Sequence, residues 1–232
     1  MEPELSVSQI ILKLLKNPSY LFAVYAMTNF KFIVTALQYW VPYYMKTVLK
    51  ADEHIVVMLV TGTVLSATTV GALAGGIIAT KFLGSYTNKR SIFMCFLMLT
   101  ILSGASMPLS YVSSEYLFIG CVWLIMFCNG FIEPIFTGIL LNSVSSEEGA
   151  TASSVLIFMQ MILGFLPAPY VYGLLVDYMP LIDNEGDNMS PWGMRGVSFY
   201  SILGVFSLLM SILVRKRSPQ SEKDMVHSIV SI

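Results

Sequence analysis

The chain has 232 residues, of which 56% are hydrophobic and 12% are charged, and its formal net charge is −1. Soluble domains carry about twice this share of charged residues, and a balanced charge argues against nucleic-acid binding. The apolar residues gather in stretches of about twenty, each long enough to cross a hydrocarbon core of about 30 Å as a helix. The composition therefore predicts an all-α, polytopic integral membrane protein.

Six membrane-spanning helices are predicted. In chain order they cover residues 18–45, 55–82, 91–109, 116–141, 152–176 and 197–214. Residues 1–17 combine apolar residues at helical spacing with two lysines, which predicts a cytoplasmic linker or interfacial helix. The chain therefore divides into residues 1–17, a six-helix transmembrane bundle over 18–217, and a polar cytoplasmic tail over 218–232.

The lysines and arginines predict the orientation of the bundle. An even number of spans places both termini on one side, and that side carries nine Lys and Arg residues against three on the other. The positive-inside rule makes the terminal side cytoplasmic. The glycosylation sequon at Asn188 falls in the long loop on the opposite side, in agreement. These signals do not distinguish the plasma membrane from an endolysosomal membrane.

The first span carries a one-sided polar stripe. Its members, Thr28, Lys31, Thr35, Gln38 and Pro42, follow spacings of three and four, so they share one face of a helix. An ionised lysine deep in a membrane costs about 2.5–3.5 kcal/mol on insertion scales, so it faces protein or water. We interpret the stripe as the lining of a cavity, and the alternative is a buried hydrogen-bond network without a ligand.

The fourth span repeats this pattern with Asn129, Glu133 and Thr137, each four residues apart. Pro134 removes a backbone donor beside the glutamate, which predicts a kink. Glu133 could pair with Lys31, bind a proton, or meet a cationic ligand. These three alternatives remain open.

The fifth span combines a polar residue with helix breakers. Gln160, Gly164 and Pro167 share one face, and the segment GFLPAPYVYG also contains Pro169 and Gly173, so the helix ladder is predicted to break twice. With Pro42 and Pro134, these breaks could let spans bend during a conformational cycle. In the second span, Gly71, Gly75 and Gly76 predict close approach of a neighbouring helix.

Catalytic and metal chemistry find little support in the sequence. The two histidines, His54 and His227, lie near a span end and in the tail, so a base for intramembrane serine chemistry is missing. Cys95, Cys121 and Cys128 fall inside apolar runs without metal-ligand spacing. We expect no enzyme activity, no cofactor and no bound metal.

Three segments carry a resemblance to a known family. LLKNPSYL is similar to the entry into the seventh span of major facilitator superfamily transporters, and EEGATASSV followed by LGFLPAPYVYGLLVD is similar to their eleventh span. GGIIATKFLGSYTNKR resembles the second copy of their cytoplasmic loop motif, except that Thr80 stands where the motif has an acid. The residues that fit this motif are Gly76, Lys81, Gly84, Lys89 and Arg90. Within the superfamily, TALQYWVPYYM, TGTVLSATTVGALAGG and PAPYVYG are most similar to Spinster-like proteins, which are associated with lipid-derived amphiphiles.

The resemblance implies the C-terminal six-helix half of such a transporter. The first and fourth spans would be the seventh and tenth helices of the family, which line its central cavity, and the two halves would alternate access around a midplane site. It implies secondary transport of a small organic or amphiphilic solute, with possible proton coupling through Glu133. Partners would be membrane lipid, the solute, and either a missing N-terminal half, which the linker-like start favours, or a second copy. The alternative function is a non-transporting membrane scaffold or an inactive half-transporter fragment.

Overall fold

A computed structural model describes residues 7–83, 89–141, 148–183 and 191–216. The regular secondary structure within these ranges is entirely helical, and these ranges contain no β-strand. Six helical stretches are long and apolar enough to cross a membrane, as predicted. They are Tyr20–Thr47, Glu53–Lys81, Arg90–Ser110, Glu115–Leu141, Gly149–Tyr178 and Trp192–Val214. The predicted tail over 218–232 lies outside the described residues.

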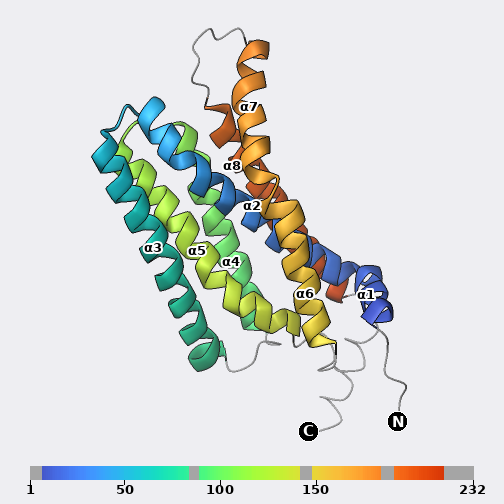
Figure 1. The fold of residues 1–232 in the computed structure, drawn as a ribbon. Helices are drawn as coiled ribbons and strands as arrows, with labels where there is room; N and C mark the ends of the chain where they lie inside the picture. Colours follow the sequence, from blue (N-terminus) through green and yellow to red (C-terminus); the bar gives the residue numbers. More distant parts are fainter. Residues whose placement is uncertain (1–6, 84–88, 142–147, 184–190, 217–232) are drawn as a thin grey trace, which may run out of the picture.

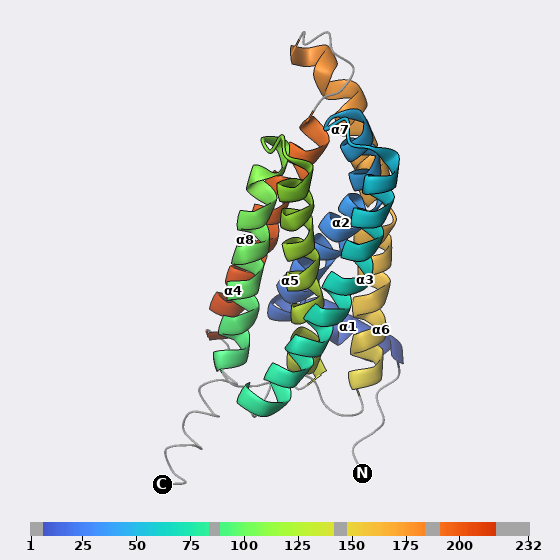
Figure 2. The same ribbon diagram turned by 90° about the vertical axis from the view of Figure 1, so that its left-hand side faces the viewer.

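The α-helices are α1 (Val7–Lys16), α2 (Pro18–Thr47), α3 (Glu53–Ile78), α4 (Lys89–Ser106), α5 (Glu115–Leu141), α6 (Gly149–Met159), α7 (Ala168–Asp183) and α8 (Trp192–Lys216). Two π-helices, η1 (Ala79–Leu83) and η3 (Gln160–Phe165), and one 3-10 helix, η2 (Met107–Ser110), extend the spans. One face of the bundle presents α3, α5, α2 and the α6–α7 span, and α4 and α8 lie on the opposite side (Figures 1 and 2). The helix α1 and the last turn of α8 lie at the same end (Figure 1).

Helix α2 is the centre of the bundle. Of its most apolar 18-residue window, 72% is buried, against 22% for α3. Asn29 donates from Nδ2 to the carbonyl oxygen of Tyr200 in α8 over 2.8 Å, and Ser207 of α8 donates to the carbonyl oxygen of Phe22 over 2.9 Å. Because lipid tails are as apolar as the helices, such hydrogen bonds and close packing hold membrane helices together.

Helices α3 and α5 touch backbone to backbone through three glycines. A Cβ at Gly71 would lie 2.3 Å from the carbonyl oxygen of Phe127, and one at Gly130 would lie 2.5 Å from that of Thr68. Gly75 meets α5 in the same way. A Cβ at Gly76, by contrast, would meet nothing within 4 Å. The predicted close approach is therefore confirmed for Gly71 and Gly75 and is wrong for Gly76, because Gly76 points away from α5.

Four buried serines join α4 to α8. The hydroxyls of Ser103 and Ser201 lie 2.8 Å apart, and those of Ser106 and Ser201 lie 3.1 Å apart. Ser198 donates to the carbonyl oxygen of Ser106 over 2.5 Å. Each hydroxyl is small enough to let the helices approach and finds a polar partner, so burial leaves no group unsatisfied.

The prolines have different effects in different spans. Helix α2 continues through Pro42, and α5 continues through Pro134. In the fifth span the α-helix changes to the π-helix η3, and regular α-helix resumes at Ala168. Here Trp40 of α2 donates from Nε1 to the carbonyl oxygen of Pro169 over 2.9 Å. A role for these residues in bending or gating stays a prediction.

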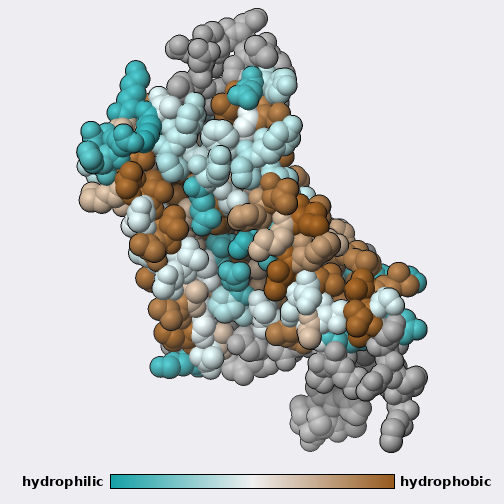
Figure 3. All heavy atoms as spheres, viewed as in Figure 1, coloured by the Kyte–Doolittle hydropathy of each residue, from teal (hydrophilic) through white to brown (hydrophobic). Residues whose placement is uncertain are grey.

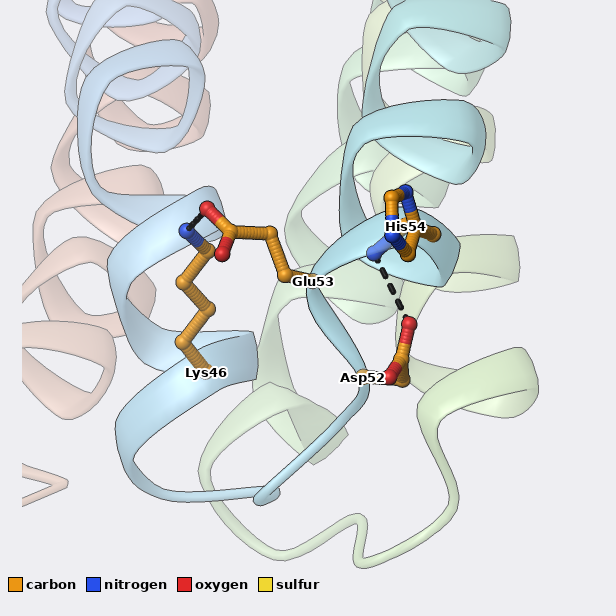
Figure 4. A network of polar contacts seen from close by, with 4 residues as sticks. All are labelled: Lys46, Asp52, Glu53 and His54. Atoms are coloured by element: carbon orange, nitrogen blue, oxygen red, sulfur yellow. Dashed lines mark hydrogen bonds and ion pairs between the residues drawn. The ribbon is translucent and has the colours of Figure 1, made fainter.

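A short turn joins α2 to α3. Figure 4 shows the Lys46 ammonium group paired with the Glu53 carboxylate across this turn. The Asp52 side chain accepts a hydrogen bond of 2.9 Å from the backbone N–H of His54 and so caps α3. Lys50 has a φ of 56°, the left-handed region that favours glycine. The turn is thus closed by local polar contacts at the end of the bundle opposite α1.

Candidate functional site

The polar stripe of α2 divides between the interior and the surface. Thr28 and Thr35 are buried, at 1% and 6% exposed. Lys31 and Pro42 are half-buried, and Gln38 is exposed. The Thr28 hydroxyl is buried without a hydrogen-bond partner. The stripe therefore brings the Lys31 amine and the Gln38 amide to the surface. The Thr28 hydroxyl stays in the interior without a hydrogen-bond partner.

The polar residues of α5 reach the surface as well. Glu133 is exposed, and Asn129, Pro134 and Thr137 are half-buried. The Thr137 hydroxyl donates to the carbonyl oxygen of Glu133 over 2.8 Å, so it is satisfied within its own helix. The Glu133 carboxylate has no hydrogen bond or ion pair in the part of the chain that the structure describes.

Lys31 and Glu133 lie at similar depth. The rings of Tyr44 in α2 and Phe118 in α5 stack with centroids 5.1 Å apart, which sets the register of these antiparallel helices. At 1.5 Å per residue, Lys31 is about 20 Å from Tyr44 and Glu133 is about 22 Å from Phe118 along the two helices. Both charged groups therefore lie about 20 Å from this aromatic pair along their helices.

A hydrophilic band runs along the face that presents α2 and α5. Figure 3 shows hydrophilic residues down the middle of this face, with apolar residues on both sides. Away from the ends of α2 and α5, the strongly polar residues that reach the surface are Lys31, Gln38, Asn129 and Glu133. Each of these side chains costs free energy in hydrocarbon, so we do not expect them on a face that contacts only acyl chains.

Lys31 and Glu133 do not form an ion pair with each other. Within the described residues the ion pairs are Lys13–Glu148 and Lys46–Glu53, both at the ends of the bundle. Lys31 also donates no hydrogen bond there. These two opposite charges, which reach the surface of the bundle, thus do not neutralise each other and remain available to a solute, to water or to a partner.

The fifth span packs on α2 beside Lys31. A Cβ at Gly164 would lie 2.8 Å from the carbonyl oxygen of Thr28 and 3.2 Å from the Lys31 Cβ. Gln160, in the same π-helix, is buried at 8% exposed. The structure therefore brings Gly164 of the fifth span against Thr28 and Lys31 of the first span. Pro169 and Gly173 lie farther along, where a Cβ at Gly173 would meet the Trp40 ring at 3.2 Å.

The residues of the loop motif lie near the end of the bundle that holds α1. A Cβ at Gly76 would meet nothing within 4 Å, and the side chains of Lys81 and Arg90 are exposed. Thr80, which replaces the acid of the motif, donates to the carbonyl oxygen of Gly76 over 3.0 Å, so its hydroxyl is satisfied locally. Lys89 begins α4. Gly84 and the sequon residue Asn188 lie outside the described residues.

Sequence reasoning missed several polar residues that the fold brings together. The serines of α4 and α8 are spaced three apart in each span, as Ser103 and Ser106 and as Ser198 and Ser201. That repeated spacing in two apolar spans was the available signal. Asn29 was overlooked because it lies beside the stripe, yet it is completely buried against α8. No group of three potential metal ligands occurs among the residues described.

Comparison with known proteins identifies the family. The model of the family described as Major Facilitator Superfamily matches residues 2–169, well over half of the chain. The chain belongs to the major facilitator superfamily. Members of this superfamily are secondary transporters, and the six apolar helices make this chain an integral, multi-pass membrane protein of that class.

No curated protein matches the sequence. The narrower similarity to Spinster-like proteins therefore stays a prediction. The assignment of α2 and α5 to the cavity-lining helices of the family also stays a prediction. The hydrophilic band lies on these same two helices.

Proposed function

We propose that this chain forms the C-terminal half of a secondary transporter and moves a small organic or amphiphilic solute, such as a lipid-derived amphiphile, along the hydrophilic band. The transport step is alternating access, in which this bundle rocks against a second six-helix unit around a site at mid-depth. The observation that carries the proposal is the presence of Lys31 and Glu133 at similar depth, with no ion pair to either among the residues described.

The second unit is an N-terminal half or a second copy of this chain, and it faces the band. Contact with such a unit and with a hydrated pathway would remove Lys31, Gln38 and Glu133 from lipid, which lowers the cost of placing them in the membrane. The excess of Lys and Arg at the end that holds α1 supports a cytoplasmic location for the termini.

Glu133 is the residue we assign to proton coupling. Its carboxylate is exposed on the band and has no basic partner within the described residues, so it is free to exchange a proton with water in the pathway. Lys31 supplies a fixed positive charge for an anionic group of the solute. Gly164 allows the fifth span to approach Lys31 closely, so that a movement of this span alters the site.

Uptake by vesicles that contain the protein tests this function. Solutes are first selected from a panel of small organic and amphiphilic compounds by flux into vesicles with wild-type protein. Lys31→Ala and Glu133→Gln are expected to lower uptake at least tenfold, whereas the matched control Lys50→Ala is expected to retain it. Membrane insertion of each variant is measured by protease protection. Normal uptake by both site variants would remove these residues from the mechanism, and absence of flux for every solute would favour a scaffold or an inactive fragment.

A further inference from the structure

Arg195 occupies an unusual position at the end of the bundle opposite α1. Its guanidinium carbon lies 4.9 Å from the centroid of the Trp192 ring and 5.8 Å from that of the Tyr111 ring. The Nε atom is buried and has no hydrogen-bond partner. Within the part of the chain that the structure describes, no carboxylate pairs with Arg195. Among the residues described, this permanently charged group therefore contacts two aromatic rings and no carboxylate.

Below Arg195, α8 presents a continuous apolar stripe. Phe199, Ile202 and Phe206 follow at spacings of four, three and four residues, and they are 67%, 45% and 58% exposed. Residues at these spacings share one side of a helix. From Arg195 to Phe206 the stripe is about 16 Å long, which is close to the thickness of one hydrocarbon leaflet.

A matching stripe lies on the neighbouring helix. Thr100, Gly104 and Met107 have the same spacing on α4 and η2, and all three are exposed. The buried serines hold α4 against α8 beneath both stripes. Tyr111 completes the second stripe and meets Arg195, so the two stripes flank the same side of the α4–α8 seam. Gly104 is exposed and a Cβ there would meet nothing within 4 Å, so there is open space beside the seam at that point.

We propose that the α4–α8 seam binds a phospholipid, with the headgroup phosphate on Arg195 and an acyl chain along the two stripes. Phosphate oxygens accept paired hydrogen bonds from the free edge of a guanidinium, and the rings of Trp192 and Tyr111 hold that guanidinium in place. Tryptophan and tyrosine are the side chains that occupy the headgroup level of a bilayer. Because this end lies opposite α1, the lipid belongs to the leaflet away from the termini. The site lies on the side of the bundle away from the hydrophilic band (Figures 1 and 2), so it does not depend on the proposed transport function.

Thermal unfolding of the delipidated full chain in detergent, with added phosphatidylglycerol, tests the site. At ten times the dissociation constant, the lipid is expected to raise the unfolding midpoint of the wild type by about 3–6 °C. Inorganic phosphate and a diacylglycerol with the same acyl chains are expected to give less than a third of that shift. Either of them giving the full shift would overturn the proposal, since the site would then recognise a free anion or acyl chains alone.

Two variants and a control locate the effect. Arg195→Gln is expected to abolish the shift, and Gly104→Phe is expected to abolish it by occupying the open space beside the seam where the acyl chain would lie. Gly104→Phe keeps the test valid if Arg195→Gln fails to fold, because Gly104 is exposed and a Cβ there meets nothing within 4 Å. The control Lys50→Gln removes a positive charge at the same end and should retain the full shift. A full shift in Arg195→Gln or in Gly104→Phe would overturn the proposal.

Discussion

The Cβ position of Gly75 in α3 lies 2.2 Å from the carbonyl oxygen of Phe131 in α5. Real Cβ atoms do not approach a carbonyl oxygen this closely, so any residue larger than glycine must push the two helices apart. The next residue, Gly76, has open space around its Cβ position. Two adjacent glycines in one helix thus differ completely in what they contribute to packing.

Gly75→Ala is expected to destabilise the bundle by about 1–3 kcal/mol, because the added methyl group overpacks the contact with α5. Gly76→Ala is the matched control and should be neutral or slightly stabilising, since alanine is the better helix former. Thermal or denaturant unfolding in the same detergent measures both changes. Equal midpoints for the two variants would show that α3 and α5 do not meet at Gly75.

Ser201→Ala is expected to lower stability by about 1 kcal/mol. Its hydroxyl lies within hydrogen-bond distance of both Ser103 and Ser106, and removing it leaves buried hydroxyls with fewer partners. Ser154→Ala serves as the control, because the Ser154 hydroxyl bonds only to Ala150 in its own helix and is exposed. A double-mutant cycle with Ser103→Ala measures the coupling between the helices, and a coupling energy of zero would contradict the contact.

Lys13→Gln is expected to destabilise the chain by about 1 kcal/mol and Lys46→Gln by less than about 0.5 kcal/mol. Lys13 pairs with Glu148 over 2.6 Å, and the Glu148 side chain is 7% exposed, so loss of Lys13 weakens the neutralisation of a buried carboxylate. Lys46 and Glu53 are both well exposed, and water already screens that pair. Unfolding in low and high salt checks the difference. A larger effect at Lys46 would contradict the assigned burial.

Lys50→Gly is expected to stabilise the turn between α2 and α3 by up to about 1 kcal/mol, because the φ of 56° is strained for any residue with a Cβ. Lys50→Ala removes the same charge but keeps the Cβ, so it should leave stability nearly unchanged. The unfolding midpoints of the three proteins measure this comparison. A gain in Lys50→Ala equal to that in Lys50→Gly would assign the effect to charge and not to backbone strain.

Much of the candidate site could be read from helix periodicity. The stripe containing Lys31 and the repeat containing Glu133 were visible as polar residues at spacings of three and four. Periodicity assigns residues to a face, but it does not say how deeply the face is buried. Thr28 and Thr35 belong to the same stripe as Gln38, yet the packing of η3 and other neighbours on α2 buries the two threonines and leaves Gln38 at the surface.

The amino-acid sequence by itself determined that this protein crosses a membrane six times as helices, because apolar length and the backbone's need for hydrogen bonds in lipid allow little else. It also determined which residues would be costly there, chiefly Lys31 and Glu133. Only the tertiary structure decided that these two charges stand at one depth without pairing, that Gly75 is a contact and Gly76 is not, and that four serines join α4 to α8. These outcomes depend on which helices are neighbours and at what register, and contacts between residues distant in sequence leave no local periodic signal.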